Sequence, residues 1–139
     1  MSESTTGKEI DPGGVNHPAH YNIDPSGVEC IDIVRWMSFN VGSAFKYLFR
    51  AGKKSTENPI KDLNKAVWYL KDELSMFPGD RLLVRTNRSK FAAEMERVID
   101  SREGDIQQAM YGIYWDNLIS AIKYIENEIE RLSLELEPS

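Results

Sequence analysis

Apolar residues recur at spacings of three and four along most of this chain, which is the periodicity of an amphipathic α-helix. Within residues 59–76, for example, the apolar stripe consists of Ile60, Leu63, Val67, Leu70 and Leu74. No long segment alternates between apolar and polar residues, as a half-buried β-strand would. The sequence therefore predicts an all-α fold, a compact bundle of about five helices with an ordered, histidine- and proline-rich loop near the N-terminus.

Capping and helix-breaking residues place the ends of the expected helices. Ser26 and Asn40 are candidate N-caps. Gly52 fits the position after a helix C-terminus, and Pro59 suits a first helical turn. We therefore expect helices over residues 28–37, 41–51, 59–76, 89–101 and 105–135.

The chain of 139 residues is long enough to form one domain with a real hydrophobic core. Residues 1–14 are polar and end in Asp-Pro-Gly-Gly, so we expect a disordered tail there. Residues 15–76 are expected to form the helical core, and residues 77–139 a helical extension packed on the same domain. The apolar stripes of the third and last helices could bury more surface than one small chain provides, which predicts a homo-oligomer.

Charge, hydropathy and cysteine content exclude several classes of protein. The net charge of −5 argues against binding of duplex DNA, which requires a basic face. No apolar run approaches the roughly 18 residues needed to cross a bilayer, and the polar N-terminus lacks a signal-peptide core. The single cysteine, Cys30, cannot form an intramolecular disulfide, which suits a reducing compartment. We therefore expect a cytoplasmic protein that does not associate with membranes.

The segment 39–54 carries four cations and no acid, although the chain as a whole is acidic. Helical spacing places Lys46 and Arg50 one turn apart on one face, and no acid stands four residues away to balance either. A turn after Arg50 would bring Lys53 toward the same space. Both residue types bind phosphate, and the neighbouring Tyr47 offers a ring on which a base can stack. These residues favour an anion or nucleotide site over a solvated face.

A second cationic cluster follows the third expected helix. It consists of Arg81, Arg85, Arg88 and Lys90, in residues 81–90, which we expect to form a loop or a short extended segment. The role of these arginines is open, and one alternative is that they complete a phosphate site across a subunit interface.

Two acids on the first expected helix, Glu29 and Asp32, lie three residues apart. They form either a solvated face with local ion pairs or a magnesium-binding pair of the kind found in helical nucleotide pyrophosphohydrolases. The neighbouring Cys30 is expected to be a small core residue. The sequence contains neither a P-loop nor a G-x-G-x-x-G motif, so no familiar nucleotide motif identifies the site.

Both histidines of the chain lie in the sequence VNHPAHYN, which holds Asn16, His17, His20 and Tyr21. The set of ligands near them is too incomplete for a recognisable zinc site, so we expect no metal here. Two alternatives remain. These side chains either pin the N-terminal loop onto the helices by hydrogen bonds or line a ligand pocket by stacking on a ring and donating to phosphate.

Four blocks of the sequence occur together, and in the same order, in a known family. They are VNHPAHYN, ECIDIVRWM, FNVGSAFKYLFRAGKK and KDLNKAVWYLKDEL, within residues 15–76. In these blocks the chain resembles the SaV-like family of small bacteriophage proteins, many of which have no assigned function. Its characterised relatives include the small nucleoside-monophosphate kinase of podophages, which lacks a P-loop. One departure is Ser43, where the family commonly has asparagine, and the residues from Phe77 onward do not resemble the kinase.

The resemblance implies a phage nucleotide-handling protein in the host cytosol, and most specifically phosphoryl transfer to a (deoxy)nucleoside monophosphate. ATP or another nucleoside triphosphate is the expected phosphate donor, and a requirement for Mg²⁺ is left open. Alternatives are a non-catalytic protein that binds or sequesters host nucleotides, a helical nucleotide pyrophosphohydrolase, and a host-protein interaction module. The expected catalytic residues are Lys46, Arg50 and His17. The expected substrate-binding residues are Asn16, His20, Tyr21, Asn40, Tyr47 and Lys53.

Overall fold

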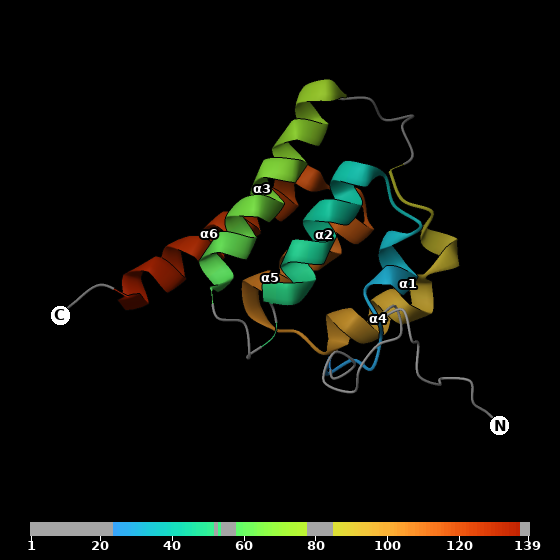
Figure 1. The fold of residues 1–139 in the computed structure, drawn as a ribbon, viewed down its shortest axis with the longest axis horizontal. Coiled ribbons are helices and arrows are strands. Elements are labelled where there is room, and N and C mark those ends of the chain that lie inside the picture. The colour runs from blue at the N-terminus through green and yellow to red at the C-terminus, as the bar shows by residue number, and fades with distance from the viewer. Residues whose placement is uncertain (1–23, 52, 54–57, 78–84, 137–139) are drawn as a thin grey trace, which may run out of the picture.

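The computed structural model describes residues 24–51, 53, 58–77 and 85–136, and within these ranges it is all-α, as the sequence predicts. The helices are α1 (Ile31–Val34), α2 (Phe39–Ala51), α3 (Pro59–Met76), α4 (Ala92–Asp100), α5 (Gly104–Tyr114) and α6 (Leu118–Leu136) (Figure 1). No strand forms in the described part of the chain, where the β-structure is one isolated bridge. The histidine-rich loop and the N-terminal tail expected from the sequence lie outside these residues.

Helix α2 packs along α3, with α5 and α6 behind this pair (Figure 1). The most extensive helix–helix contacts join α2 to α3, α5 to α6, and α3 to α6. The shorter helices α1 and α4 contact each other on the side of α2 that faces away from α3 (Figure 1). Residues from the C-terminal half of the chain therefore share one bundle with α2 and α3.

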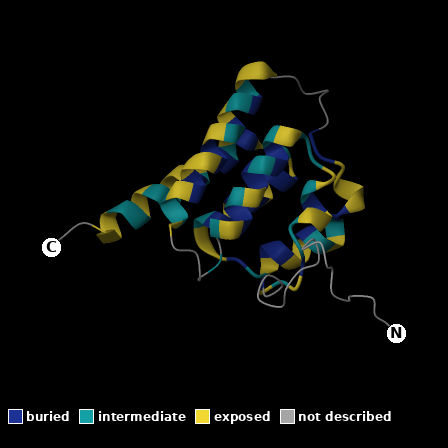
Figure 2. Cartoon of the chain, viewed as in Figure 1, coloured by how far each residue is buried: buried dark blue, intermediate teal, exposed yellow. Residues whose placement is uncertain are grey.

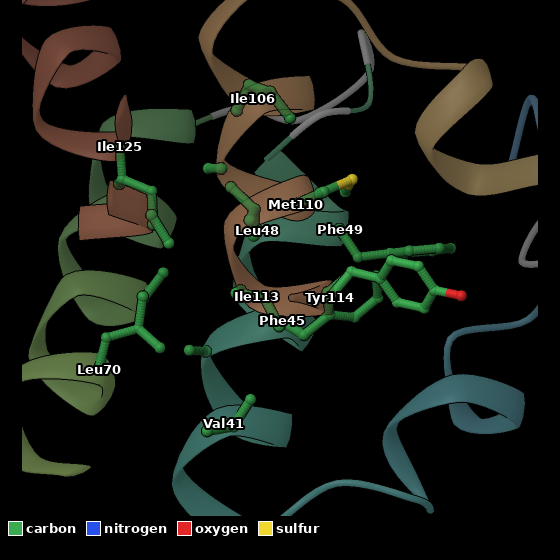
Figure 3. Packing of buried hydrophobic residues seen from close by; sticks show 14 of the residues in the cluster. Val41, Phe45, Leu48, Phe49, Leu70, Ile106, Met110, Ile113, Tyr114 and Ile125 are labelled. Carbon is green, nitrogen blue, oxygen red and sulfur yellow. The ribbon is translucent and has the colours of Figure 1, made fainter. Parts of the chain in front are cut away.

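The apolar stripes predicted from spacing form the core of this bundle. In α2 the side chains of Val41, Phe45 and Leu48 are fully buried, and they meet Met110 of α5 and other apolar side chains in the interior (Figure 3). Figure 2 shows the buried residues where helices face one another and the exposed residues on the outer sides. Full burial of each large apolar side chain contributes about 1.5–3 kcal/mol to folding.

The predicted bounds of the third helix are confirmed, since α3 covers Pro59–Met76. Asn58 caps it, because the Asn58 side chain accepts a hydrogen bond from the backbone N–H of Lys61 at 3.0 Å. Pro59 occupies the first turn, where no intrahelical partner is needed for a backbone N–H. Local chemistry at this N-terminus is therefore sufficient to set where the helix begins.

The prediction of one long helix over residues 105–135 is wrong, because a turn separates α5 from α6. Asp116 adopts a left-handed conformation with φ of 59°, which aspartate tolerates better than most residues. The Asn117 side chain then accepts a hydrogen bond from the N–H of Ser120 at 3.1 Å and caps α6. At Gly112 a Cβ would lie 2.9 Å from the Cβ of Ala121, so glycine permits the close approach of the two helices.

The first two helices also differ from expectation at their ends. Helix α1 covers Ile31–Val34 and not residues 28–37. Ser26 does not cap it, because the Ser26 hydroxyl accepts from the N–H of Val28 and donates to the Asp24 carboxylate in a preceding turn. Helix α2 begins at Phe39, so Asn40 lies inside it and is not its cap. Side-chain hydrogen bonds within the turn compete with helix formation here.

A buried arginine joins the end of α3 to the turn between α5 and α6. The Arg85 guanidinium donates to the Glu73 carboxylate at 3.0 Å and to the Asp116 carboxylate at 3.1 Å. A backbone bridge between Met37 and Thr86 holds the adjoining segment in place. Arg85 is thus engaged in the fold, while its neighbour Arg81 lies outside the described residues.

None of the helices in the described ranges is both long and apolar enough to cross a membrane. The expectation that no segment of this kind exists is therefore confirmed for these residues.

Replacing Arg85 with methionine should destabilise the protein by about 3–5 kcal/mol, because Glu73 would remain buried without its cation. Urea unfolding followed by circular dichroism measures this loss. The matched control is Arg88→Met, three residues along, where the exposed guanidinium lies 5.1 Å from the Trp115 ring. Its loss should be about 1 kcal/mol or less. Equal losses in the two variants would contradict a structural role for Arg85.

Candidate functional site

A cleft of about 390 Å³ lies between the segment that leads into α1 and one face of α2. The first wall comes from residues between Asp24 and Ile31. The second wall comes from Lys46, Phe49 and Arg50 of α2 and from Lys53 just after it. Because α2 buries its opposite face in the core, its polar face is held rigidly against the cleft.

Three cations that the sequence singled out, Lys46, Arg50 and Lys53, line this one cleft. Lys46 and Arg50 are one helical turn apart and exposed, as their spacing predicts. The Lys53 ammonium lies 5.2 Å from the centre of the Phe49 ring. Within the described part of the chain, neither lysine forms an ion pair. Their charges are therefore available to an anion in the cleft.

Arg50 does have a carboxylate partner, which corrects the expectation that no acid balances it. The Asp62 carboxylate of α3 accepts from the Arg50 guanidinium at 2.8 and 3.0 Å, in a bidentate pair. Asp62 is 97% shielded from solvent, whereas the arginine side chain is 62% exposed. This hydrogen bond raises the pKa of the Arg50 guanidinium. Spacing along one helix could not show this, because the acid comes from a neighbouring helix.

A buried pair anchors the first wall of the cleft to α2. The Arg102 guanidinium donates to both carboxylate oxygens of Asp24, at 2.8 and 3.2 Å. It also donates to the Phe49 carbonyl at 3.1 Å, one of the last α2 carbonyls, which have no partner within the helix. The two paired residues are 78 positions apart, so the sequence carried no signal for this contact.

The environment of Asp24 favours its ionised form. Burial by itself would raise the pKa of this carboxyl, but hydrogen bonds from Arg102 and Ser26 outweigh that cost. The pKa therefore lies below the ordinary value of 3.8. The Asp24 charge is neutralised by Arg102, so it adds little repulsion against an anion in the cleft.

Tyr47 lies beside the cleft and does not line it. Its ring stacks on Tyr69 of α3, with ring centres 6.1 Å apart and planes 12° apart. Three cations surround the Tyr47 ring: the Lys46 ammonium at 4.7 Å, the Lys65 ammonium at 5.2 Å and the Arg50 guanidinium at 5.8 Å. The ring organises these side chains by cation–π attraction. The expected stacking of a base on Tyr47 stays a prediction.

Of the remaining predicted substrate residues, the structure describes Asn40. Asn40, which was expected in the site, donates from its amide to the Asp72 carboxylate at 3.0 Å and links α2 to α3. It does not line the cleft. Asn16, His17, His20 and Tyr21 lie outside the residues that the structure describes.

Cys30 and Glu29 also line the cleft. Burial raises the pKa of the Cys30 thiol to about 12, although Lys46 and Lys53 partly oppose this, so the thiol is protonated near neutral pH. This protonated state argues against Cys30 as a nucleophile. Cys30 packs against the core but is only partly buried, whereas the sequence predicted a core residue. Among the described residues there is no group of three or more His, Cys, Asp or Glu that could hold a metal ion.

The buried pair predicts a specific dependence of stability on pH. The folded pKa of Asp24 lies below its unfolded value, so the pair stabilises the fold above pH 3.8 and loses this effect as the pH falls through the folded pKa. Asp24→Asn should therefore cost about 3 kcal/mol at pH 7 and much less in strong acid. Thermal unfolding from neutral to strongly acidic pH, with the exposed Asp100→Asn as control, tests this. A difference that stays constant across the series would contradict it.

The family comparison falls on this same region. A family model described as a protein of unknown function, DUF3310, matches residues 15–71. The match is less than half of the chain, but it contains both walls of the cleft and most of α3. No curated protein and no solved structure is significantly similar to this chain. The cleft therefore lies in the part of the chain that is similar to other proteins, and the similarity brings no stated function with it.

Proposed function

We propose that this protein binds a nucleotide through its phosphate groups in the cleft between residues 24–31 and α2. The single observation that carries the proposal is that Lys46, Arg50 and Lys53 converge on one cleft of an acidic protein. Lysine ammonium groups act on phosphate as mobile point charges. The cleft volume of about 390 Å³ falls in the usual range for small-ligand sites.

Asp62 supports this proposal by fixing the direction of the Arg50 guanidinium at the cleft. A guanidinium held by a bidentate carboxylate loses little further freedom when an anion binds near it. The Asp24–Arg102 pair has a similar effect on the opposite wall, which it ties to the α2 backbone. A site organised in this way before binding loses less affinity to ordering of side chains.

We further propose that the bound nucleotide takes part in phosphoryl transfer to a (deoxy)nucleoside monophosphate. In this reaction the bond between the γ-phosphorus and the bridging oxygen of a nucleoside triphosphate breaks. A bond forms between that phosphorus and a phosphate oxygen of the monophosphate, giving two diphosphates. The attacking oxygen is already ionised near neutral pH, so the reaction needs positioning and charge neutralisation more than a protein nucleophile.

The described residues match that requirement. They offer two lysine ammonium groups and the Asp62-paired Arg50 guanidinium at one cleft, and the cleft thiol is protonated. A role for His17 in donating to phosphate oxygens remains part of the proposal and concerns a residue outside the described ranges.

Lys46→Gln and Lys53→Gln should each weaken binding of ATP or a deoxynucleoside monophosphate about tenfold, because each removes one charge-assisted contact to phosphate. Isothermal titration calorimetry measures the affinity. Lys123→Gln, an exposed lysine on α6, makes the same change of charge away from the cleft and should have little effect. Arg50 is best tested as Arg50→Gln with Asp62→Asn, since Arg50→Gln alone would leave a buried carboxylate unpaired.

Equal affinities in the cleft variants and the Lys123 control would exclude the cleft as the phosphate site. The same proteins, incubated with ATP and each deoxynucleoside monophosphate, should form diphosphates that chromatography resolves. Tight binding without diphosphate would instead favour the non-catalytic alternative, a protein that sequesters nucleotides.

A further inference from the structure

A second hollow, shallow and widely open to solvent, lies on the outer face of α3. Two cations, two amides, an isoleucine and an indole line it: Lys61, Lys65, Asn58, Asn64, Ile60 and Trp68. Among the residues that the structure describes, no carboxylate lines the hollow. Within those same residues the hollow and the cleft have no lining residue in common.

The indole of Trp68 is 60% exposed, although tryptophan is usually largely buried. Its ring meets Tyr69 edge-on, with ring centres 5.1 Å apart and planes 86° apart. This edge-to-face contact restricts the orientation of the indole. A planar apolar ring that is held in place and open to solvent is suited to stacking against a nucleobase.

Among the described residues, the charged side chains that line this hollow are both lysines. Lys61 and Lys65 are one helical turn apart on α3, and neither forms an ion pair within the described ranges. Asp62 between them points inward to Arg50 and is 2% exposed, so it does not neutralise them at the surface. Like charges that face each other along a helix are unfavourable until an anion binds between them. Asn64 adds an exposed amide that can donate to and accept from a base edge.

The hollow adjoins the cleft at Tyr47. Lys65 lines the hollow, and its ammonium lies 5.2 Å from the centre of the Tyr47 ring. Lys46 and Arg50 line the cleft and lie at 4.7 and 5.8 Å from the same ring centre. One group of cations therefore separates two recesses. A reaction between two nucleotides needs this arrangement, because their phosphates must meet while their bases occupy different places.

We propose that the α3 hollow binds a second nucleotide, with its base stacked on Trp68 and its phosphate held by Lys61 and Lys65. The pairing of this site with the cleft rests on the proposed function, whereas binding in the hollow depends on its own residues. The ligand is a mononucleotide, and the phosphate group, not the base alone, determines much of its affinity.

Tryptophan fluorescence tests the proposal, because the chain offers a matched control. Trp115 is also 60% exposed and also lies next to a cation, with the Arg88 guanidinium 5.1 Å from its ring centre. The pair Trp36→Phe and Trp115→Phe leaves Trp68 as the reporter, and the pair Trp36→Phe and Trp68→Phe leaves Trp115. Each protein is titrated with AMP, dTMP and ATP, and with adenosine as the ligand that lacks phosphate.

The proposal predicts saturable quenching of Trp68 by the nucleotides, weaker quenching by adenosine, and no saturation at Trp115. Lys61→Gln or Lys65→Gln should raise the dissociation constant measured at Trp68 about tenfold. Equal or unsaturable quenching of both reporters would overturn it. Quenching by a single-stranded oligonucleotide but not by mononucleotides would also overturn it, because the face would then bind a nucleic-acid strand.

The two proposals fail in different ways. Introducing Lys46→Gln and Lys53→Gln into the Trp68 reporter should leave its quenching by AMP saturable if the hollow binds by itself. Saturable quenching of Trp68, together with unchanged calorimetric affinity in the Lys46→Gln and Lys53→Gln variants, would exclude the cleft as a nucleotide site and support binding in the hollow. Loss of affinity in the cleft variants, together with Trp68 fluorescence that does not change on titration, would exclude binding in the hollow and support binding in the cleft.

Discussion

The buried Arg102 guanidinium holds the two walls of the cleft together. It neutralises Asp24 in the first wall and bonds to the Phe49 carbonyl in the second, so one side chain from beyond α4 sets their spacing. Removing either charge of such a pair leaves the other buried without a partner, which is more costly than never burying them. The spacing of the two cleft walls therefore depends on a residue that is not among the residues lining the cleft.

Helix α2 contributes both to the core and to the candidate site, because one of its faces is buried and the other lines the cleft. Phe45 and Leu48 are fully buried in the core, while Lys46 and Arg50 on the other side reach the cleft. The core fixes the rotation of the helix about its axis, and that rotation determines where the cations lie. Asp62 and Tyr47 then restrict the side chains, so the site gains order from both packing and electrostatics.

The helical periodicity of the sequence predicted the all-α fold, the core face of α2 and both ends of α3, because these depend on local spacing and capping. It also placed Lys46 and Arg50 on one face. It missed the break at Asp116, since apolar periodicity continues on both sides of a single left-handed residue. It also missed the Asp62 and Arg102 contacts, which span 12 and 78 positions, because ion pairs between elements leave no mark in local spacing.

The central claim is that nucleotide phosphates bind between residues 24–31 and α2. The most direct test is a titration of the ¹⁵N-labelled protein with ATP, followed by amide chemical shifts. The account predicts saturable shifts in residues 27–31 and 46–53, and an apparent dissociation constant from those shifts that is about tenfold higher in Lys46→Gln. Shifts confined to the C-terminal half of α6, or no shifts at saturating ATP, would contradict it.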